Sequence, residues 1–203
     1  IPMALGEWEL LPFWHTLFTS LGFGIKVSSP SSHDLYTQGQ QTIVSDTVCY
    51  PAKLMHGHVE DLKNKGVDYI FAPSLTYNIN EDKGDNHYNC PVVAYYPEVI
   101  RCNVKMGGKT RLLSPFLDIS NEKTFPKYFT KQMHNEGIEL KEKDVKRATE
   151  LAYKALYDYK KEVENEGKRI IEVSRKENIP LVVLVGRPYH VDSEINHGID
   201  TLL

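Results

Sequence analysis

The stretch CYPAKLMHGHVEDLKNKGVDYIFAP, residues 49–73, decides the fold of this 203-residue chain. Pro51 suits the first turn of a helix, because it lacks the amide hydrogen that would be left unpaired there. A helix is therefore predicted from about Pro51 to Lys65, and Gly66 ends it. Val67–Pro73 follows at once as a compact apolar run, which is typical of a buried strand. A helix that leads directly into a buried strand indicates the α/β class.

The segments on either side repeat this alternation. Pro2–Leu5 and Gly24–Ser28 are predicted strands, a short helical turn is expected near Asp34–Gln38, and Pro91–Tyr95 is a further strand candidate. Strands that alternate with helices imply a mainly parallel sheet covered by helices on both faces. Between the first two strands a helix is predicted to end at Gly22, from the helical spacing of Trp8, Leu11, Phe13, Trp14, Leu17, Phe18 and Leu21.

A long helix is predicted in the second half of the chain, from Asp144 to about Gly167, and Lys168–Asn178 continues as a second helix. Pro180 then permits a strand at Leu181–Val185, and Gly186 opens a tight turn. We expect a first domain at 1–135, a helical connector at 136–178 and the truncated start of a second α/β domain at 179–203. The predicted stripe of the long helix is Val145, Ala148, Ala152, Ala155, Leu156, Tyr159 and Val163.

Composition excludes several classes of protein. A formal charge of -3, from 24 basic and 27 acidic residues, provides no positive field for a nucleic-acid backbone. The most apolar stretches are strand-sized, so no membrane span is expected. Cys49, Cys90 and Cys102 form no Cys-x-x-Cys pair and are odd in number, which favours a reducing cytoplasm over a secreted disulfide framework. Since the chain begins at Ile1 and stops inside an apolar pattern, we expect a piece of a longer protein.

Cys49 is the first candidate for chemistry. It lies immediately before a predicted helix, where free amide hydrogens and the positive end of the dipole stabilise a thiolate. A thiolate there can bind a metal, and the same amides can hydrogen-bond the sulfurs of an iron–sulfur cluster. The alternative is a buried structural cysteine.

His56 and His58 raise the question of a zinc site with Cys49. Two histidines separated by one residue lie on different faces of a helix, unlike the i, i+4 pair that chelates one ion. We therefore predict that both histidines serve packing or hydrogen bonding.

Cys90 precedes the predicted strand Pro91–Tyr95 and could approach Cys49 in space. At the amino end of a strand, however, it would lie on the edge of the sheet opposite the ligand crevice. Cys102 is predicted to serve packing.

Arg187 follows the predicted strand Leu181–Val185 in the run Gly186-Arg187-Pro188-Tyr189-His190. Its planar, doubly donating cation suits a carboxylate or phosphate, which makes Arg187 and His190 candidates for substrate binding. The alternative is an arginine that pairs with Asp192 or Glu194 to fix the loop.

Several longer runs of the sequence resemble the CoA-substrate-specific enzyme activase-related family. They span nearly the whole chain, and only Lys109 to Lys176 carries little of the resemblance. The runs are Leu11-Pro12-Phe13-Trp14, Leu21-Gly22-Phe23, Ser45-Asp46-Thr47-Val48-Cys49-Tyr50-Pro51-Ala52-Lys53-Leu54, His56-Gly57-His58, Asn89-Cys90-Pro91-Val92-Val93, Tyr96-Pro97-Glu98, Gly186-Arg187-Pro188-Tyr189-His190 and Asn196-His197-Gly198-Ile199-Asp200.

The resemblance implies kinship with the iron–sulfur subunits of 2-hydroxyglutaryl-CoA dehydratases, whose flavodoxin-like (Rossmann-type) domains hold a [4Fe-4S] cluster between them by cysteines. In that system an ATP-driven activator delivers one electron, which enables removal of water from a 2-hydroxyacyl-CoA. The resemblance makes Cys49 an expected cluster ligand and Cys90 a second. It also implies that ATP binds only to a separate activator module and that the partners are this ATPase, an acyl-CoA or a dehydratase.

Ser74 departs from the family pattern, because family members tend to show Pro-Cys after the strand Tyr69–Phe71 and this chain has Pro73-Ser74. A hydroxyl is a weaker iron ligand than a thiolate, so Ser74 is a cofactor-binding candidate that leaves a full cluster in this chain in question.

Three functional hypotheses result. The first is a dehydratase-like domain of an activase-related protein that serves ATP-coupled electron transfer to a low-potential iron–sulfur centre. The alternative is a cluster-free module that docks on the ATPase activator or an acyl-CoA partner, for which Ser74 is the main support. Zinc-dependent hydrolysis at Cys49 or His56 is a third reading.

Overall fold

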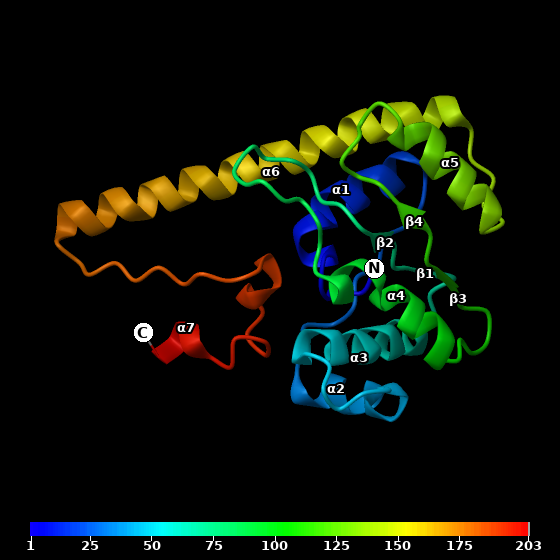
Figure 1. Ribbon diagram of the computed structural model, residues 1–203, viewed down its shortest axis with the longest axis horizontal. Helices are drawn as coiled ribbons and strands as arrows, with labels where there is room; N and C mark the ends of the chain where they lie inside the picture. Colours follow the sequence, from blue (N-terminus) through cyan, green and yellow to red (C-terminus); the bar gives the residue numbers. More distant parts are fainter. Residues whose placement is uncertain (203) are drawn as a thin grey trace.

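The computed structural model describes residues 1–202 (Figure 1), and Leu203 lies outside them. Helices and strands are interleaved along the chain, which confirms the α/β class. The elements are α1 (Glu7–Ser20), α2 (His33–Gly39), α3 (Tyr50–Asn64), β1 (Tyr69–Phe71), β2 (Ser74–Leu75), α4 (Pro91–Asn103), β3 (Arg111–Leu113), β4 (Phe116–Leu117), α5 (Phe125–Asn135), α6 (Glu142–Glu177) and α7 (Ile199–Leu202), with 3-10 turns at Gln40–Thr42 and Pro188–Val191.

The strands form two short parallel pairs, β1 with β3 and β2 with β4, that continue one another. Between the pairs the amides of Ala72 and Ser74 donate to the carbonyls of Leu113 and Pro115, at 2.9 Å each. Pro115 has no amide hydrogen to donate in return, so the ladder is interrupted at that residue. In the described residues the predicted parallel sheet is this ribbon, and a flavodoxin-like fold stays a prediction.

Helices cover both faces of the ribbon, as the alternating pattern predicts. Phe71 and Leu75 point into a core formed with α1, α5 and α6. Ile70 and Ala72 point the other way, into a core formed with α3 and α4. Successive strand residues face opposite sides, which explains the division. Figure 1 shows α2 outside α3.

Two expected strands, Pro2–Leu5 and Gly24–Ser28, are absent from the described structure. Backbone pairing with the second segment is made by Ile1: its nitrogen donates to the Lys26 carbonyl at 2.8 Å, and its carbonyl accepts from the Ser28 amide at 3.1 Å. The Met3 amide donates to the Ser28 hydroxyl instead of to the backbone, at 2.8 Å. The chain then turns into α1 through Leu5, whose φ is 53°. This left-handed turn ends the pairing before a strand can extend.

The strand predicted at Pro91–Tyr95 is wrong, because these residues form the first turns of α4. Pro91 occupies the first helical turn, where a missing amide hydrogen costs nothing. The buried residues Tyr96 and Ile100 then recur four positions apart, which is a helical period. In the sequence the apolar run Pro91–Tyr95 masks this helical period, because a continuous apolar run also suits a strand.

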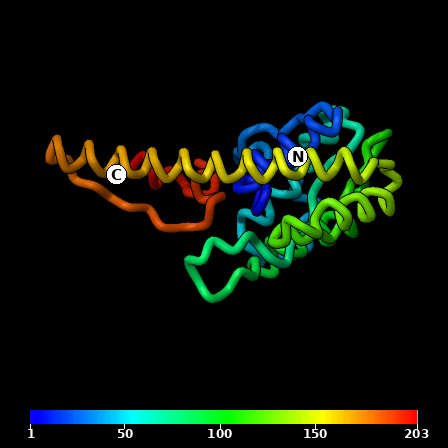
Figure 2. The backbone as a smooth tube through the Cα atoms, turned by 90° about the horizontal axis from the view of Figure 1, so that it is seen from above, coloured from blue at the N-terminus to red at the C-terminus, as the bar shows by residue number. Residues whose placement is uncertain are grey.

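The long helix α6 is one element of 36 residues, not the two helices predicted on either side of Gly167. Its first half is packed against α1 and α5 through residues such as Ala152 and Leu156. The second half extends beyond the body of the protein (Figures 1 and 2). Helix α6 ends at Glu177, and Asn178 after it takes the left-handed conformation with φ 54°.

The strand predicted at Leu181–Val185 is also absent: this segment runs back from the end of α6 without a strand partner among residues 1–202 (Figure 1). Its apolar side chains are exposed, up to 88% for Val185. An apolar run predicts a buried strand only when a neighbouring strand is present to bury it.

Across residues 1–202, no helix combines the length with the apolar character that crossing a bilayer requires.

Candidate functional site

Cys49 is the residue that begins α3, as the sequence predicts. It is extended, with φ −61° and ψ 150°, and Pro51 lies in the first turn that follows. The thiol is free and exposed, so the alternative of a buried structural cysteine is wrong. In the first turn Pro51 has no amide hydrogen, and the amides of Ala52 and Lys53 donate to the Cys49 carbonyl at 3.1 and 3.2 Å. The positive end of the helix dipole is therefore the main feature that favours negative charge on the sulfur.

Cys90 occupies the same position on α4, with φ −52°, ψ 137° and Pro91 directly after it. Its thiol is free and half-buried. The objection that Cys90 marks the amino end of a strand is removed, since Pro91–Asn103 is a helix.

Both cysteines lie at the carboxyl edge of the parallel ribbon. Helix α4 starts after the loop that leaves β2, and Leu75 of β2 lines a small cavity together with Asn89 and Val93 on either side of Cys90. Helix α3 ends just before β1 begins, so its last turn lies at the amino edge of the ribbon. The start of α3, at Cys49, therefore lies at the carboxyl edge, where β1 ends. This is the edge at which open α/β sheets bind ligands.

Tyr189 connects the starts of the two helices. Its ring packs together with Tyr50, which follows Cys49, on a small apolar cluster that contains Leu54. It also lines the cavity next to Cys90, with Asn89 and Val93. Burial raises the pKa of Tyr189; Arg187 opposes this, and charge on Cys49 and Cys90 adds to it. Sequence reasoning missed Tyr189, because a single tyrosine in a loop motif indicates no role.

Ser74 is buried beneath the same edge. Its side chain is on the face of the ribbon shared with Ile70 and Ala72, because the residues alternate, and α3 and α4 cover that face. Ser74 is 1% exposed and its hydroxyl has no hydrogen-bond partner among the described residues. Buried hydroxyls without a partner are uncommon, so this oxygen is a notable feature of the site.

His56 is fully buried and both of its ring nitrogens are bonded. The Thr42 hydroxyl donates to the Gly39 carbonyl at 2.9 Å, so it accepts from Nδ1–H of His56 at 2.8 Å. Nε2 is then the acceptor for the Tyr96 hydroxyl at 3.0 Å. Burial lowers the pKa of His56 to about 4.

His58 is held in the same way on the other side of α3. The Ser31 hydroxyl donates to the Asp192 carboxylate at 2.6 Å and therefore accepts from Nε2–H of His58 at 3.0 Å. Ser28 donates to Nδ1 at 2.7 Å. Burial lowers the pKa of His58 to about 4, against the opposing charge of Asp192. The hydrogen-bonding role predicted for both histidines is confirmed.

Gly57 between the two histidines is required by packing. A Cβ on Gly57 would overlap the backbone carbonyl of Leu35 and come within 2.7 Å of its side chain, and a Cβ on Gly39 would overlap the Gly57 backbone. Helices α2 and α3 therefore cross in direct backbone contact at these two glycines.

The segment after Gly186 packs back on α2 and α3. Asp192 is 5% exposed and bonded to Ser31, and the Tyr50 hydroxyl donates to the Glu194 carboxylate at 2.6 Å. Ile195 packs with Leu54. The sequence did not indicate this docking, because its partners are more than a hundred residues apart in the chain.

Arg187 and His190 have different roles in this segment. The Arg187 amide donates to Nδ1 of His190 at 2.8 Å, so the histidine ring closes the turn. The Arg187 guanidinium forms no ion pair within residues 1–202, and the alternative of pairing with Asp192 or Glu194 is wrong, since Ser31 and Tyr50 bond those carboxylates.

A family model described as the CoA enzyme activase uncharacterised domain matches residues 1–203, the whole chain. The chain belongs to this family. No curated protein and no solved structure matches it. The match confirms the CoA-substrate-specific enzyme activase-related resemblance.

The activase-family domain offers two thiols at one edge and no complete metal site of its own. Among the described residues, no three His, Cys, Asp or Glu side chains are grouped so as to hold an ion. Both buried histidines use their ring nitrogens within the protein, which removes the basis for a zinc site on His56. Cys102 is exposed near the carboxyl end of α4, away from Cys90 at its start, and does not serve the packing role predicted for it.

Proposed function

We propose that this activase-family domain serves ATP-coupled, low-potential electron transfer through a two-thiol site at Cys49 and Cys90. The observation that supports it is the placement of these cysteines, each at the start of a helix and on either side of Tyr189. Amides of a first helical turn stabilise thiolates and hydrogen-bond the sulfurs of iron–sulfur centres.

A complete [4Fe-4S] cluster does not fit residues 1–202 alone. Such clusters use four protein ligands, and this site provides two thiols, with Ser74 as a buried hydroxyl beneath them. We propose that Cys49 and Cys90 provide part of a ligand set that another domain or chain completes. When bound, an iron–sulfur centre would supply one-electron chemistry; the residues described here bind and orient it.

Iron reconstitution tests this proposal. In the full-length protein, reconstituted without air, we expect Cys49→Ala and Cys90→Ala each to lose most of the bound iron, because a missing thiolate opens the centre. Cys102→Ala is the matched control, since it removes a thiol far from the two helix starts, and should keep its iron. Iron content and visible absorbance are the measurements, and unchanged iron in both site variants contradicts the proposal.

A second candidate is a cluster-free module that docks on an ATPase activator or acyl-CoA partner. It is favoured by Ser74 in place of a thiol and by the uncovered apolar segment Leu181–Val185. The same exposed segment supports the proposal that residues 179–203 begin a second α/β domain. A colourless, iron-free full-length protein from an oxygen-free preparation would favour the docking role.

We also propose where the protein acts and which partners it meets. We propose that the protein is cytoplasmic, on the basis of its three free cysteines, that ATP is bound by a separate activator module, and that the acyl-CoA or dehydratase partner meets the edge with Cys49.

A further inference from the structure

Arg187 is located at the mouth of two adjoining cavities. The larger has a volume of about 300 Å³ and is formed by the loop 78–89 and Glu9 of α1. The smaller, of about 40 Å³, extends between α1 and the start of α4. Asn78 and Asn89 line both cavities, and Asn86 lines the larger. Arg187 thus lines the larger cavity together with three asparagine side chains.

The turn that carries Arg187 is fixed by its neighbours. His190 accepts from the Arg187 amide through Nδ1, and its own amide donates back to the Arg187 carbonyl at 2.9 Å. A Cβ on Gly186 would lie 2.5 Å from Nδ1 of His190, so any other residue there would displace the ring that closes the turn. The backbone of Arg187 is therefore held in place, and only its side chain has to be ordered when an anion binds.

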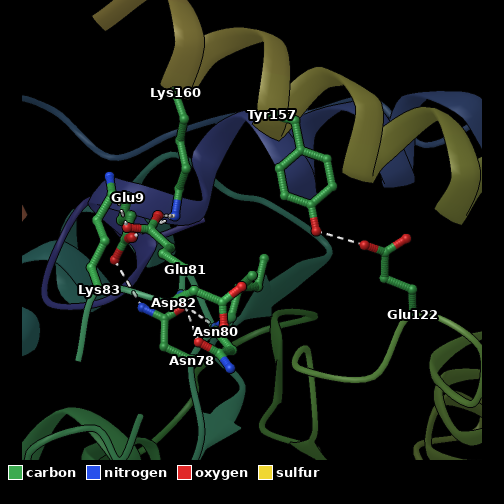
Figure 3. A network of polar contacts seen from close by, with 10 residues as sticks. Glu9, Asn78, Asn80, Glu81, Asp82, Lys83, Glu122, Tyr157 and Lys160 are labelled. Carbon is green, nitrogen blue, oxygen red and sulfur yellow. Dashed lines mark hydrogen bonds and ion pairs between the residues drawn. The ribbon is translucent and has the colours of Figure 1, made fainter. Parts of the chain in front are cut away.

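Charge around the larger cavity leaves Arg187 without a counterion. Lys160 of α6 bonds Glu9 at 3.0 Å and Glu81 at 2.5 Å (Figure 3). Burial alone would lower the pKa of Lys160, but the bonds to Glu81 and Glu9 outweigh it and raise this pKa above its usual value. Lys83 is a second cation near Glu81, at 3.8 Å. Glu9 and Glu81 are therefore paired with Lys160 and Lys83, and neither carboxylate forms an ion pair with Arg187.

Of the three asparagines around Arg187, Asn86 is the one whose NH₂ group makes no hydrogen bond among the described residues. The Asn78 amide donates to Glu9 at 3.0 Å and the Asn89 amide to the Leu75 carbonyl at 2.9 Å. Asn86 accepts from the Tyr88 amide through its carbonyl oxygen at 2.8 Å, which leaves its NH₂ group available.

We propose that Arg187 and Asn86 form an oxyanion site that binds a phosphate or carboxylate group. The guanidinium donates two parallel hydrogen bonds to such a group, which is planar or tetrahedral with adjacent oxygens. The amide of Asn86 adds a neutral donor from the lining of the larger cavity. The site is independent of the two-thiol proposal, because neither residue needs iron to bind an anion.

Anion titration of the full-length protein tests the site. Inorganic phosphate and acetate are titrated separately, with calorimetry or amide chemical shifts as the readout, so that a preference between the two oxyanions is seen directly. For whichever anion binds, we expect Arg187→Gln to weaken binding about tenfold or more, as for loss of a charge-assisted, bidentate contact. Arg175→Gln on α6 removes the same charge away from the cavities and should bind as the unchanged protein does.

A second pair of variants leaves Arg187 in place. Asn86→Asp puts a carboxylate opposite the guanidinium and should abolish anion binding, whereas Asn80→Asp adds the same charge on the exposed loop outside the cavity lining and should have little effect. Unchanged binding in Arg187→Gln overturns the proposal, as does the absence of binding of both anions to the unchanged protein. Equal losses in Asn80→Asp and Asn86→Asp overturn it too, because they would indicate net charge alone.

Discussion

Substitution of Gly57 by Ala is expected to lower the free energy of unfolding by about 3 kcal/mol, the upper part of the usual range for overpacking. The new methyl group would overlap the Leu35 carbonyl, which belongs to the backbone and cannot rotate away. Helices α2 and α3 would have to separate, which would also loosen the hydrogen bonds of His56 and His58. Urea denaturation followed by circular dichroism measures the change.

Gly167→Ala is the matched control, because Gly167 also lies inside a helix but a Cβ there meets nothing within 4 Å. The same substitution should raise stability by up to about 1 kcal/mol, since alanine is the better helix former. Opposite signs for the two variants would confirm the backbone crossing, and a neutral Gly57→Ala would contradict it.

The two buried histidines are expected to contribute a loss of stability on acidification between about pH 6.5 and pH 4. Burial lowers the pKa of His56 and of His58 to about 4, from 6.5. Over that window the unfolded chain binds protons that the folded protein does not, so stability is present at neutral pH and falls as the pH drops. Each histidine should account for a loss of at most about 2 kcal/mol by about pH 5.

The unfolding free energy measured across this range tests the expectation. His58→Gln should reduce the slope with pH, because one titrating group is gone, although the variant is less stable at neutral pH through its broken bonds to Ser28 and Ser31. His15→Gln on the exposed side of α1 leaves both buried histidines in place and should keep the loss on acidification. A slope that His58→Gln leaves unchanged would show that other groups cause it.

Prolines and glycines, which act on the backbone close to them, predicted where helices begin and end. Pro51 and Gly66 place α3 and with it Cys49, and Gly22 follows α1 by two residues, with φ 88°. The one-residue spacing of His56 and His58 correctly predicted that they lie on different sides of α3, where each forms its own hydrogen bonds.

Features that depend on distant contacts were not predictable in the same way. Pro91 introduces a helix, but the apolar residues after it suit a strand equally well, and only packing against α3 and the ribbon decides. Leu181–Val185 has the composition of a buried strand but no neighbour among residues 1–202. The role of Tyr189 depends on folding that brings residue 189 to the starts of α3 and α4, which no local pattern encodes.

The free half of α6 and the segment that returns from it make a long excursion from the body of the protein (Figure 1). Both ends of this excursion meet at Glu9: Lys160 bonds its carboxylate, and Arg187 lines the same cavity. Residues 161–186 thus form an excursion whose first and last residues are close together. The length of this excursion therefore has no effect on the geometry of the edge that carries the cysteines. Shortening or replacing the excursion would change how far the protein reaches without moving the residues at its base.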